Sequence, residues 1–334
     1  GITIKSQAVA IPYRAADGTE YVLNLVDTPG HVDFSYEVSR SIAACEGAVL
    51  LIDASQGVEA QTLANLYLAM EHDLAVIPVI NKIDLPSADI ENTREMIEVD
   101  LGLDSDGAIL CSAKDGIGIE DILEAITKRI PAPRGEKEKP FRALIFDARY
   151  DSFRGTIISC RIVDGTVREG DIIRLMSLGT THKIEEVGVF RIAREKRPSL
   201  SAGEVGYIIA GIKTVSDTRI GDTIVHDVDP MPPALPGFKE VKPVVFSSIY
   251  PIDSDENSAL ADALEKYKLN DAALIYQRDS SAALGHGFRC GFLGLLHLEV
   301  FQERLEREFN QGIIMTSPSV EYKFILANGD EIEV

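Results

Sequence analysis

Residues 21–38 read YVLNLVDTPGHVDFSYEV and pass from an apolar run through a turn into a helical pattern. The run 21–26 is rich in Tyr, Val and Leu, as β-strands are, and Pro29-Gly30 marks a turn. Apolar residues at helical spacing then predict a helix over 34–45. A strand, a loop and a helix in this order predict one unit of an α/β sheet. The loop then lies at the carboxyl end of the strand, where such sheets bind ligands.

Similar units flank this stretch. Apolar runs predict strands over residues 2–11, 21–26, 48–53, 74–80 and 108–111. Between them, the apolar spacing predicts helices over residues 34–45, 60–71, 90–101 and 118–130. Alternating strands and helices are typical of a mostly parallel sheet covered by helices. The first domain is therefore predicted to be α/β and to span residues 1–133.

A different pattern follows a proline-containing run over 131–140, which predicts a linker that we place at 134–140. Short strands separated by turn signals then predict a β-barrel domain over 141–236. These strands are expected over residues 143–147, 156–163, 171–176, 183–190, 204–210 and 221–225. Asp164-Gly165 is a strong hairpin-turn signal within them. A cluster of basic side chains inside this domain is expected on a solvated loop, with RNA contact as the alternative; it comprises Arg191, Arg194, Lys196 and Arg197.

Residues 237–334 show a third pattern, in the order β-α-β-β-α-β. Strands are predicted over residues 244–250, 272–277, 288–292 and 320–324, and helices over residues 256–269 and 294–309. This order predicts a ferredoxin-like split βαβ domain. The expected fold class is therefore a multidomain chain that combines α/β and β domains.

The composition excludes several classes of protein. The chain has 334 residues, of which 45% are hydrophobic and 26% charged, so disordered and fibrous proteins are excluded. No apolar run approaches the roughly 18 residues of a membrane span. The four cysteines lack the spacing of a zinc site or a disulfide framework. Of the net charge of −20, −14 falls in residues 1–133, which does not suit unaided nucleic-acid binding. We expect a cytoplasmic protein, with peripheral membrane association left open.

The loop Asp27-Thr28-Pro29-Gly30-His31 carries groups suited to a nucleotide's phosphates. A carboxylate at Asp27 can reach Mg²⁺ through a water ligand. Gly30 lets a bare backbone N–H approach a terminal phosphate. The imidazole of His31 then lies where an attacking water would stand, so His31 is the predicted catalytic residue.

Two further loops follow predicted strands and suit a guanine base. The Asp84 carboxylate can accept two N–H groups of guanine that adenine does not offer, while the Lys82 stem covers the ring. Asn81 is expected to brace the neighbouring loops. In Ser112-Ala113-Lys114, the small Ala113 allows a backbone N–H to approach the guanine carbonyl oxygen. Together the loops predict a guanine-nucleotide site.

These motifs, with the stretches DTPGHVDFSYEV and GVEAQT, resemble those of the translational GTPases. Gly1-Ile2-Thr3-Ile4 is similar to the end of the family's first switch, so the resemblance assigns a Mg²⁺-ligating role to Thr3. VDGTVREGD at 163–171 resembles the family's second-domain barrel, and residues 269–309 are typical of one branch.

The resemblance implies a P-loop GTPase-like first domain that binds GTP or GDP with Mg²⁺. It also implies GTP hydrolysis that depends on the ribosome, through ribosomal RNA and ribosomal proteins. The expected cellular role is in translocation, or in subunit biogenesis and initiation. Two alternatives stay open: the translocase or ribosome-protection branch of the family, and a fragment that docks on the ribosome without hydrolysis.

No Gly-x-x-x-x-Gly-Lys-Ser/Thr sequence occurs in the chain. In the family that loop precedes the first switch, and its strand lies between those that end here at Val26 and Asp53. We therefore expect residues 1–334 alone to be inactive in GTP hydrolysis. Asp53, which precedes Ser55-Gln56-Gly57, is expected mainly to form a turn, with contact to the site as the alternative.

Overall fold

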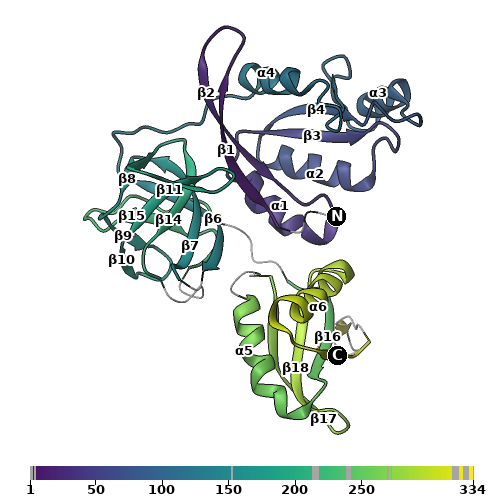
Figure 1. Cartoon of the computed structure of the whole chain (residues 1–334), viewed down its shortest axis with the longest axis vertical. Helices are drawn as coiled ribbons and strands as arrows, with labels where there is room; N and C mark the ends of the chain where they lie inside the picture. The colour runs from purple at the N-terminus through teal and green to yellow at the C-terminus, as the bar shows by residue number, and fades with distance from the viewer. Residues whose placement is uncertain are drawn as a thin grey trace. The chain divides into compact units, whose positions relative to one another are not determined.

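The computed structural model forms two compact units, one with most of residues 1–237 and one with most of residues 238–334 (Figure 1). It describes residues 3, 5–151, 153–212, 218–237, 242–268, 271, 273–317, 323–325 and 331–333. None of the helices in these residues is long and apolar enough to cross a membrane.

The α/β part of the first unit is built on a parallel sheet in the order β3 (Gly47–Asp53), β4 (Ala75–Asn81), β5 (Ile109–Leu110). Its helices are α2 (Ala60–Glu71), α3 (Ile90–Val99) and α4 (Ile119–Arg129). On β4, Ile80 packs with residues of α2 and α3, whereas Ile77 and Val79 pack with Ala125 of α4. The central strand is therefore buried on both faces, as parallel strands are.

Residues 21–27 form part of a β-hairpin and, among the described residues, do not join the parallel sheet as predicted. Strand β1 (Gln7–Arg14) pairs antiparallel with β2 (Glu20–Asp27), and the short helix η1 (Val32–Phe34) leads into α1 (Ser35–Ile42). The predicted strand over residues 2–11 was thus placed too early. Its first part includes Ile2 and Ile4, which lie outside the described residues.

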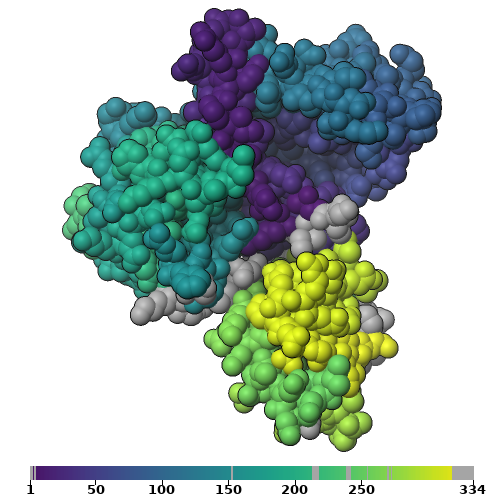
Figure 2. Space-filling view, in the orientation of Figure 1, coloured from purple at the N-terminus to yellow at the C-terminus, as the bar shows by residue number. Residues whose placement is uncertain are grey.

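The hairpin is held by side chains from both of its neighbours. The Tyr13 hydroxyl donates to Glu124 of α4 at 2.7 Å, and this bond raises the pKa of Tyr13 to about 12. Ala10 of β1 belongs to the core cluster of the barrel, and the hairpin, in purple, lies against the barrel in Figure 2.

Among the described residues no ladder joins β2 to β3, and Leu51 of β3 is 59% exposed.

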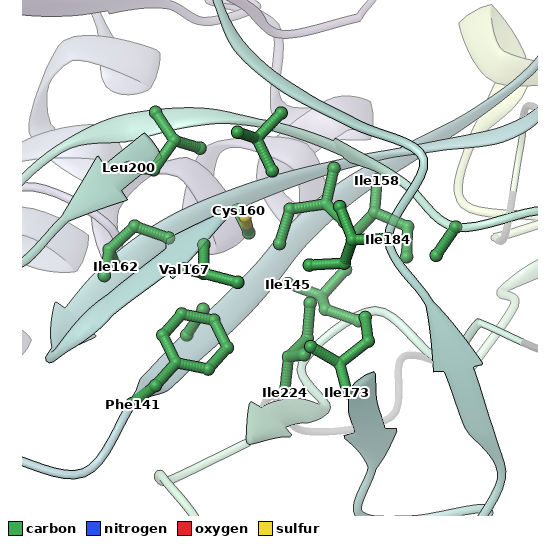
Figure 3. Packing of buried hydrophobic residues seen from close by; sticks show 14 of the residues in the cluster. Phe141, Ile145, Ile158, Cys160, Ile162, Val167, Ile173, Ile184, Leu200 and Ile224 are labelled. Atoms are coloured by element: carbon green, nitrogen blue, oxygen red, sulfur yellow. The ribbon is translucent and has the colours of Figure 1, made fainter. Parts of the chain in front are cut away.

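The barrel is an antiparallel sheet of eight strands in the order β10-β9-β15-β6-β7-β14-β11-β12, with β8 and β13 paired beside it. Its strands are β6 (Arg142–Asp151), β7 (Gly155–Asp164), β8 (Thr166–Arg168), β9 (Ile172–Leu175), β10 (Thr181–Lys183), β11 (Glu186–Phe190), β12 (Arg194–Arg197), β13 (Ser199–Ser201), β14 (Val205–Ile209) and β15 (Thr223–His226). Side chains from most of these strands meet in one core, with Ile145, Ile158 and Cys160 fully buried (Figure 3).

The basic cluster does not lie on a loop as expected. Arg194, Lys196 and Arg197 belong to the edge strand β12, and Arg191 lies in the turn before it. Each of these cations has a carboxylate partner, such as Asp151 for Arg194 and Glu169 for Lys196. The pattern failed here because charged residues on an exposed edge strand show no apolar alternation.

The predicted linker has no helix or strand, but it packs against the barrel. The Glu136 N–H donates to Asp164 at 3.3 Å, and the Gly165 N–H donates to the Glu136 carbonyl at 2.9 Å. Gly165 has a φ of 73°, and a Cβ there would lie 2.6 Å from the Cα of Phe141. The turn therefore requires glycine for its conformation and for its close packing.

We predict that Gly165→Ala lowers the free energy of unfolding of the barrel by about 2–4 kcal/mol, because left-handed strain adds to overpacking. Gly179 is the matched control: its φ is 67°, but a Cβ there meets nothing within 4 Å. Gly179→Ala is expected to cost only about 1–2 kcal/mol. Urea unfolding followed by circular dichroism measures both losses, and equal losses would contradict the steric argument.

The second unit has the predicted β-α-β-β-α-β order. Its elements are β16 (Val245–Pro251), η3 (Ser254–Glu256), α5 (Asn257–Lys268), β17 (Ile275–Ser281), β18 (Gly285–Phe292), α6 (Leu295–Phe309) and β19 (Ile313–Met315). The sheet order β17-β18-β16-β19 is that of a split βαβ domain, and the pairs are antiparallel.

The fourth strand of this sheet was predicted wrongly. It is the short β19 and not residues 320–324, of which 320–322 lie outside the described residues. Lys323–Ile325 instead forms β20, which pairs with β21 (Glu331–Glu333).

Candidate functional site

Two of the predicted loops meet at the carboxyl ends of β4 and β5. The strands are parallel, with Ile80 opposite Leu110, so the residues that follow them leave the sheet side by side. The Ser112 hydroxyl donates to Asp84 Oδ1 at 2.7 Å, and the Ala113 N–H donates to Asn81 Oδ1 at 3.1 Å. Four predicted base-site residues are thus joined by two hydrogen bonds.

The Asn81 side chain also shapes its own turn. Its Oδ1 accepts the Lys82 N–H at 2.7 Å, and Lys82 has a φ of 63°, which is uncommon for a residue with a Cβ. The Ile83 N–H then donates to the Cys111 carbonyl at 3.3 Å. Asn81 therefore bridges the two loops, in the position expected for a brace. Because Ala113 already donates to Asn81, its N–H is engaged in this state.

Lys82 forms an ion pair with Asp53, a residue that the sequence was expected to use mainly in a turn. Its Nζ lies 2.6 Å from Oδ2 of Asp53, the last residue of β3. Burial acts to raise the pKa of Asp53, but hydrogen bonds from Lys82 and Ser55 outweigh it and hold the pKa below its usual value. The hydrogen bond with Asp53 raises the pKa of Lys82. Asp53 also forms the expected turn, since Oδ1 accepts from the Ser55 N–H and hydroxyl.

Strand register is the signal that could have revealed this contact. Asp53 pairs with Asn81 across the parallel ladder β3–β4, so an acid at the end of β3 lies beside the residue that follows Asn81. Lys114 is a weaker member of the group, with its Nζ 3.9 Å from Asp84 Oδ2.

A second group lies at the end of β2. The Thr3 hydroxyl donates to Asp27 Oδ2 at 3.3 Å, and both residues are exposed. A hydroxyl and a carboxylate are oxygen donors of the kind that Mg²⁺ accepts together with water and phosphate oxygens. Gly30 is exposed, and a Cβ there would meet nothing within 4 Å, so there is open space beside its Cα. These residues fit a Mg²⁺–phosphate group.

His31 caps the short helix η1. Its Nδ1 accepts the Asp33 N–H at 3.2 Å, and its ring meets the edge of Phe34 with centroids 6.5 Å apart. The side chain is 46% exposed. With Nδ1 engaged by this backbone donor, Nε2 is the ring nitrogen left for a water molecule.

The structure thus assembles eight of the ten predicted residues into two groups, while Gly30 and His31 lie in the loop that follows Asp27. Thr3 and Asp27 form one, and Asn81, Lys82, Asp84, Ser112, Ala113 and Lys114 form the other. No hydrogen bond or ion pair joins the two groups within the described part of the chain. That one nucleotide spans both remains a prediction.

Comparison with known proteins matches two families along the chain. Residues 1–132 match the elongation factor Tu GTP binding domain, and residues 155–225 match elongation factor Tu domain 2. The first match covers the three loops predicted to bind a nucleotide, and the second covers most of the barrel.

Curated relatives named elongation factor 4 match nearly all of the chain. The protein of Syntrophobacter fumaroxidans is 71% identical over 98% of this chain and 55% of its own length. The protein of Syntrophus aciditrophicus is 69% identical over 100% of this chain and 56% of its own length. The protein of Treponema denticola is 60% identical over 99% of this chain and 55% of its own length. The chain therefore spans about half the length of the relatives it matches. From the loops that follow β2, β4 and β5 to its split βαβ domain, the chain belongs to the translational GTPase family and is similar to the elongation factor 4 proteins.

Proposed function

We propose that the complete protein binds a guanine nucleotide at the ends of β2, β4 and β5 and hydrolyses GTP in response to the ribosome. The observation that carries this proposal is the joined group of Asn81, Asp84, Ser112 and Ala113. The Ser112 bond fixes the Asp84 carboxylate, which then accepts two N–H groups of guanine. Adenine lacks this donor pair, so the site selects guanine.

The phosphates then lie toward the other group. Mg²⁺ would be held by the Thr3 hydroxyl and, through a water, by Asp27; when bound it neutralises charge on the phosphates. The Gly30 N–H contacts the terminal phosphate, and His31 positions a water through Nε2. Loss of the terminal phosphate releases the segments around Thr3 and Gly30, which makes the domain a switch.

The partner in this proposal is the ribosome, and the place of action is the cytoplasm, where ribosomes are. The step affected is translocation, or subunit biogenesis and initiation. Identity to proteins named elongation factor 4 over the whole chain, including the segment 287–300, favours this branch over the translocase and ribosome-protection branches. A fragment that docks without hydrolysis is the competing function.

Turnover of GTP by the full-length protein, with and without purified ribosomes, tests the proposal. We expect ribosomes to raise the rate at least about tenfold, because the rate depends on how firmly the water-orienting group is held. A protein limited to residues 1–334 lacks the glycine-rich phosphate loop and is expected to bind GTP more weakly than micromolar. An unchanged rate would favour the docking function, and micromolar binding by residues 1–334 would contradict the predicted inactivity.

A further inference from the structure

The end of β3 places a carboxylate against the lysine of the base site. In the β3–β4 ladder, Asp53 lies opposite Asn81, the residue that precedes Lys82. The Oδ2 atom of Asp53 is 2.6 Å from the Nζ atom of Lys82. Its other oxygen accepts two hydrogen bonds from Ser55, at 2.8 Å and 2.7 Å. The Ser55 bonds fix the rotation of the carboxylate, so Oδ2 faces the lysine.

The two side chains of this ion pair differ in how far they are exposed and so in how freely they can move. The Asp53 side chain is 15% exposed and that of Lys82 is 53% exposed. A long, exposed ammonium samples many positions unless a fixed partner holds it. Asp53 is therefore the anchor, and Lys82 is the group whose position it sets.

Asp84 is the carboxylate that competes for this lysine. It attracts the Lys82 ammonium through space and contributes to the raised pKa of Lys82. Its Oδ1 already accepts the Ser112 hydroxyl, and Lys114 lies 3.9 Å from its Oδ2. An ammonium that moved onto Asp84 would occupy acceptor sites that a guanine base requires.

We propose that Asp53 is a positioning residue for guanine binding: it holds the Lys82 ammonium away from Asp84 and keeps the lysine stem extended beside the base. This inference rests on the proposed guanine-nucleotide site. It gives Asp53 a role in addition to its turn. Asp53 touches neither the base nor the phosphates in this role, since it acts through Lys82.

A double-mutant cycle in the full-length protein tests this role, with a fluorescent GDP analogue as the probe. Asp53→Asn removes the charge, and we expect it to weaken GDP binding about tenfold, as loss of a hydrogen bond between charged groups does. Asp53→Ser keeps an oxygen for the Ser55 N–H and is expected to show the same loss. In a Lys82→Met background, Asp53→Asn should change affinity by less than about twofold.

The control is Gln56→Ala, at an exposed position in the same turn, which should stay within about twofold of the unmodified protein. Two results would assign Asp53 to the turn alone and overturn the proposal. One is a tenfold loss of GDP affinity that persists in the Lys82→Met background. The other is a loss of affinity that matches the unfolded fraction seen by circular dichroism. Full affinity of both Asp53 variants would also overturn the proposal. Failure of the unmodified protein to prefer GDP over ADP would instead overturn the guanine site itself.

Discussion

Asp84→Asn is expected to lower the affinity of the full-length protein for GTP by at least about a hundredfold and to create a preference for xanthosine triphosphate. In the proposed site the carboxylate accepts two N–H groups of guanine, each worth about 1.5–3 kcal/mol. The amide that replaces it keeps its oxygen toward the Ser112 hydroxyl and turns its NH₂ toward the base. Xanthine has a carbonyl where guanine has its amine, and this carbonyl accepts the NH₂.

Competition between GTP and xanthosine triphosphate for the bound fluorescent nucleotide measures this exchange. Asp106→Asn is a suitable control, because the Asp106 side chain is 97% exposed and lies outside the three loops. Its affinity for GTP should not change. An unaltered GTP preference in the Asp84 variant would refute the assignment of Asp84 as the residue that reads the base.

His31→Ala is expected to leave GTP binding within about threefold and to lower ribosome-stimulated turnover about a hundredfold or more. The ring makes its contacts with Asp33 and Phe34 in its own loop, so its removal does not disturb the base group. The variant lacks the nitrogen that, in the proposed function, orients the attacking water.

The measurement is single-turnover GTP hydrolysis on ribosomes, beside equilibrium binding of the same variant. His72→Ala, at an exposed residue that follows α2, is the control and should retain the full rate. Equal losses of binding and hydrolysis would mean that His31 supports the structure of the loop instead of the reaction.

The sequence predicted best the elements with a long and regular pattern. Helix α2 was predicted with the bounds Ala60–Glu71 that the structure shows. Its start is marked by the Glu59 N–H, which donates to the Thr62 hydroxyl at 3.4 Å, and its apolar stripe ends with the helix. Strand β4 was equally clear because both of its faces are buried.

Short or exposed elements were missed for physical reasons. Strand β19 has three residues, too few for alternation to show, whereas the sequence beyond it alternates more clearly. Strand β1 continues through Pro12, which pattern reading takes as a stop. In the described residues its one ladder partner is β2, and such an edge position tolerates proline.

In the candidate site, too, some features could be predicted from the sequence and others could not. Loops that follow buried strands could be found from order and composition, which is how Asn81, Asp84 and Ser112 were identified. The contact between Asp53 and Lys82 depends on the register of two parallel strands, and composition carries no information on register.

We propose above that these loops hold one guanine nucleotide. The most direct test is equilibrium titration of the full-length protein with a fluorescent GDP analogue in the presence of Mg²⁺, followed by competition with GTP and with ATP. We predict that GTP displaces the analogue and that ATP at about a hundredfold excess does not, because the Asp84 carboxylate has no matching donors in adenine. Displacement by ATP as readily as by GTP, or no binding of the analogue, would contradict a single guanine-nucleotide site at these loops.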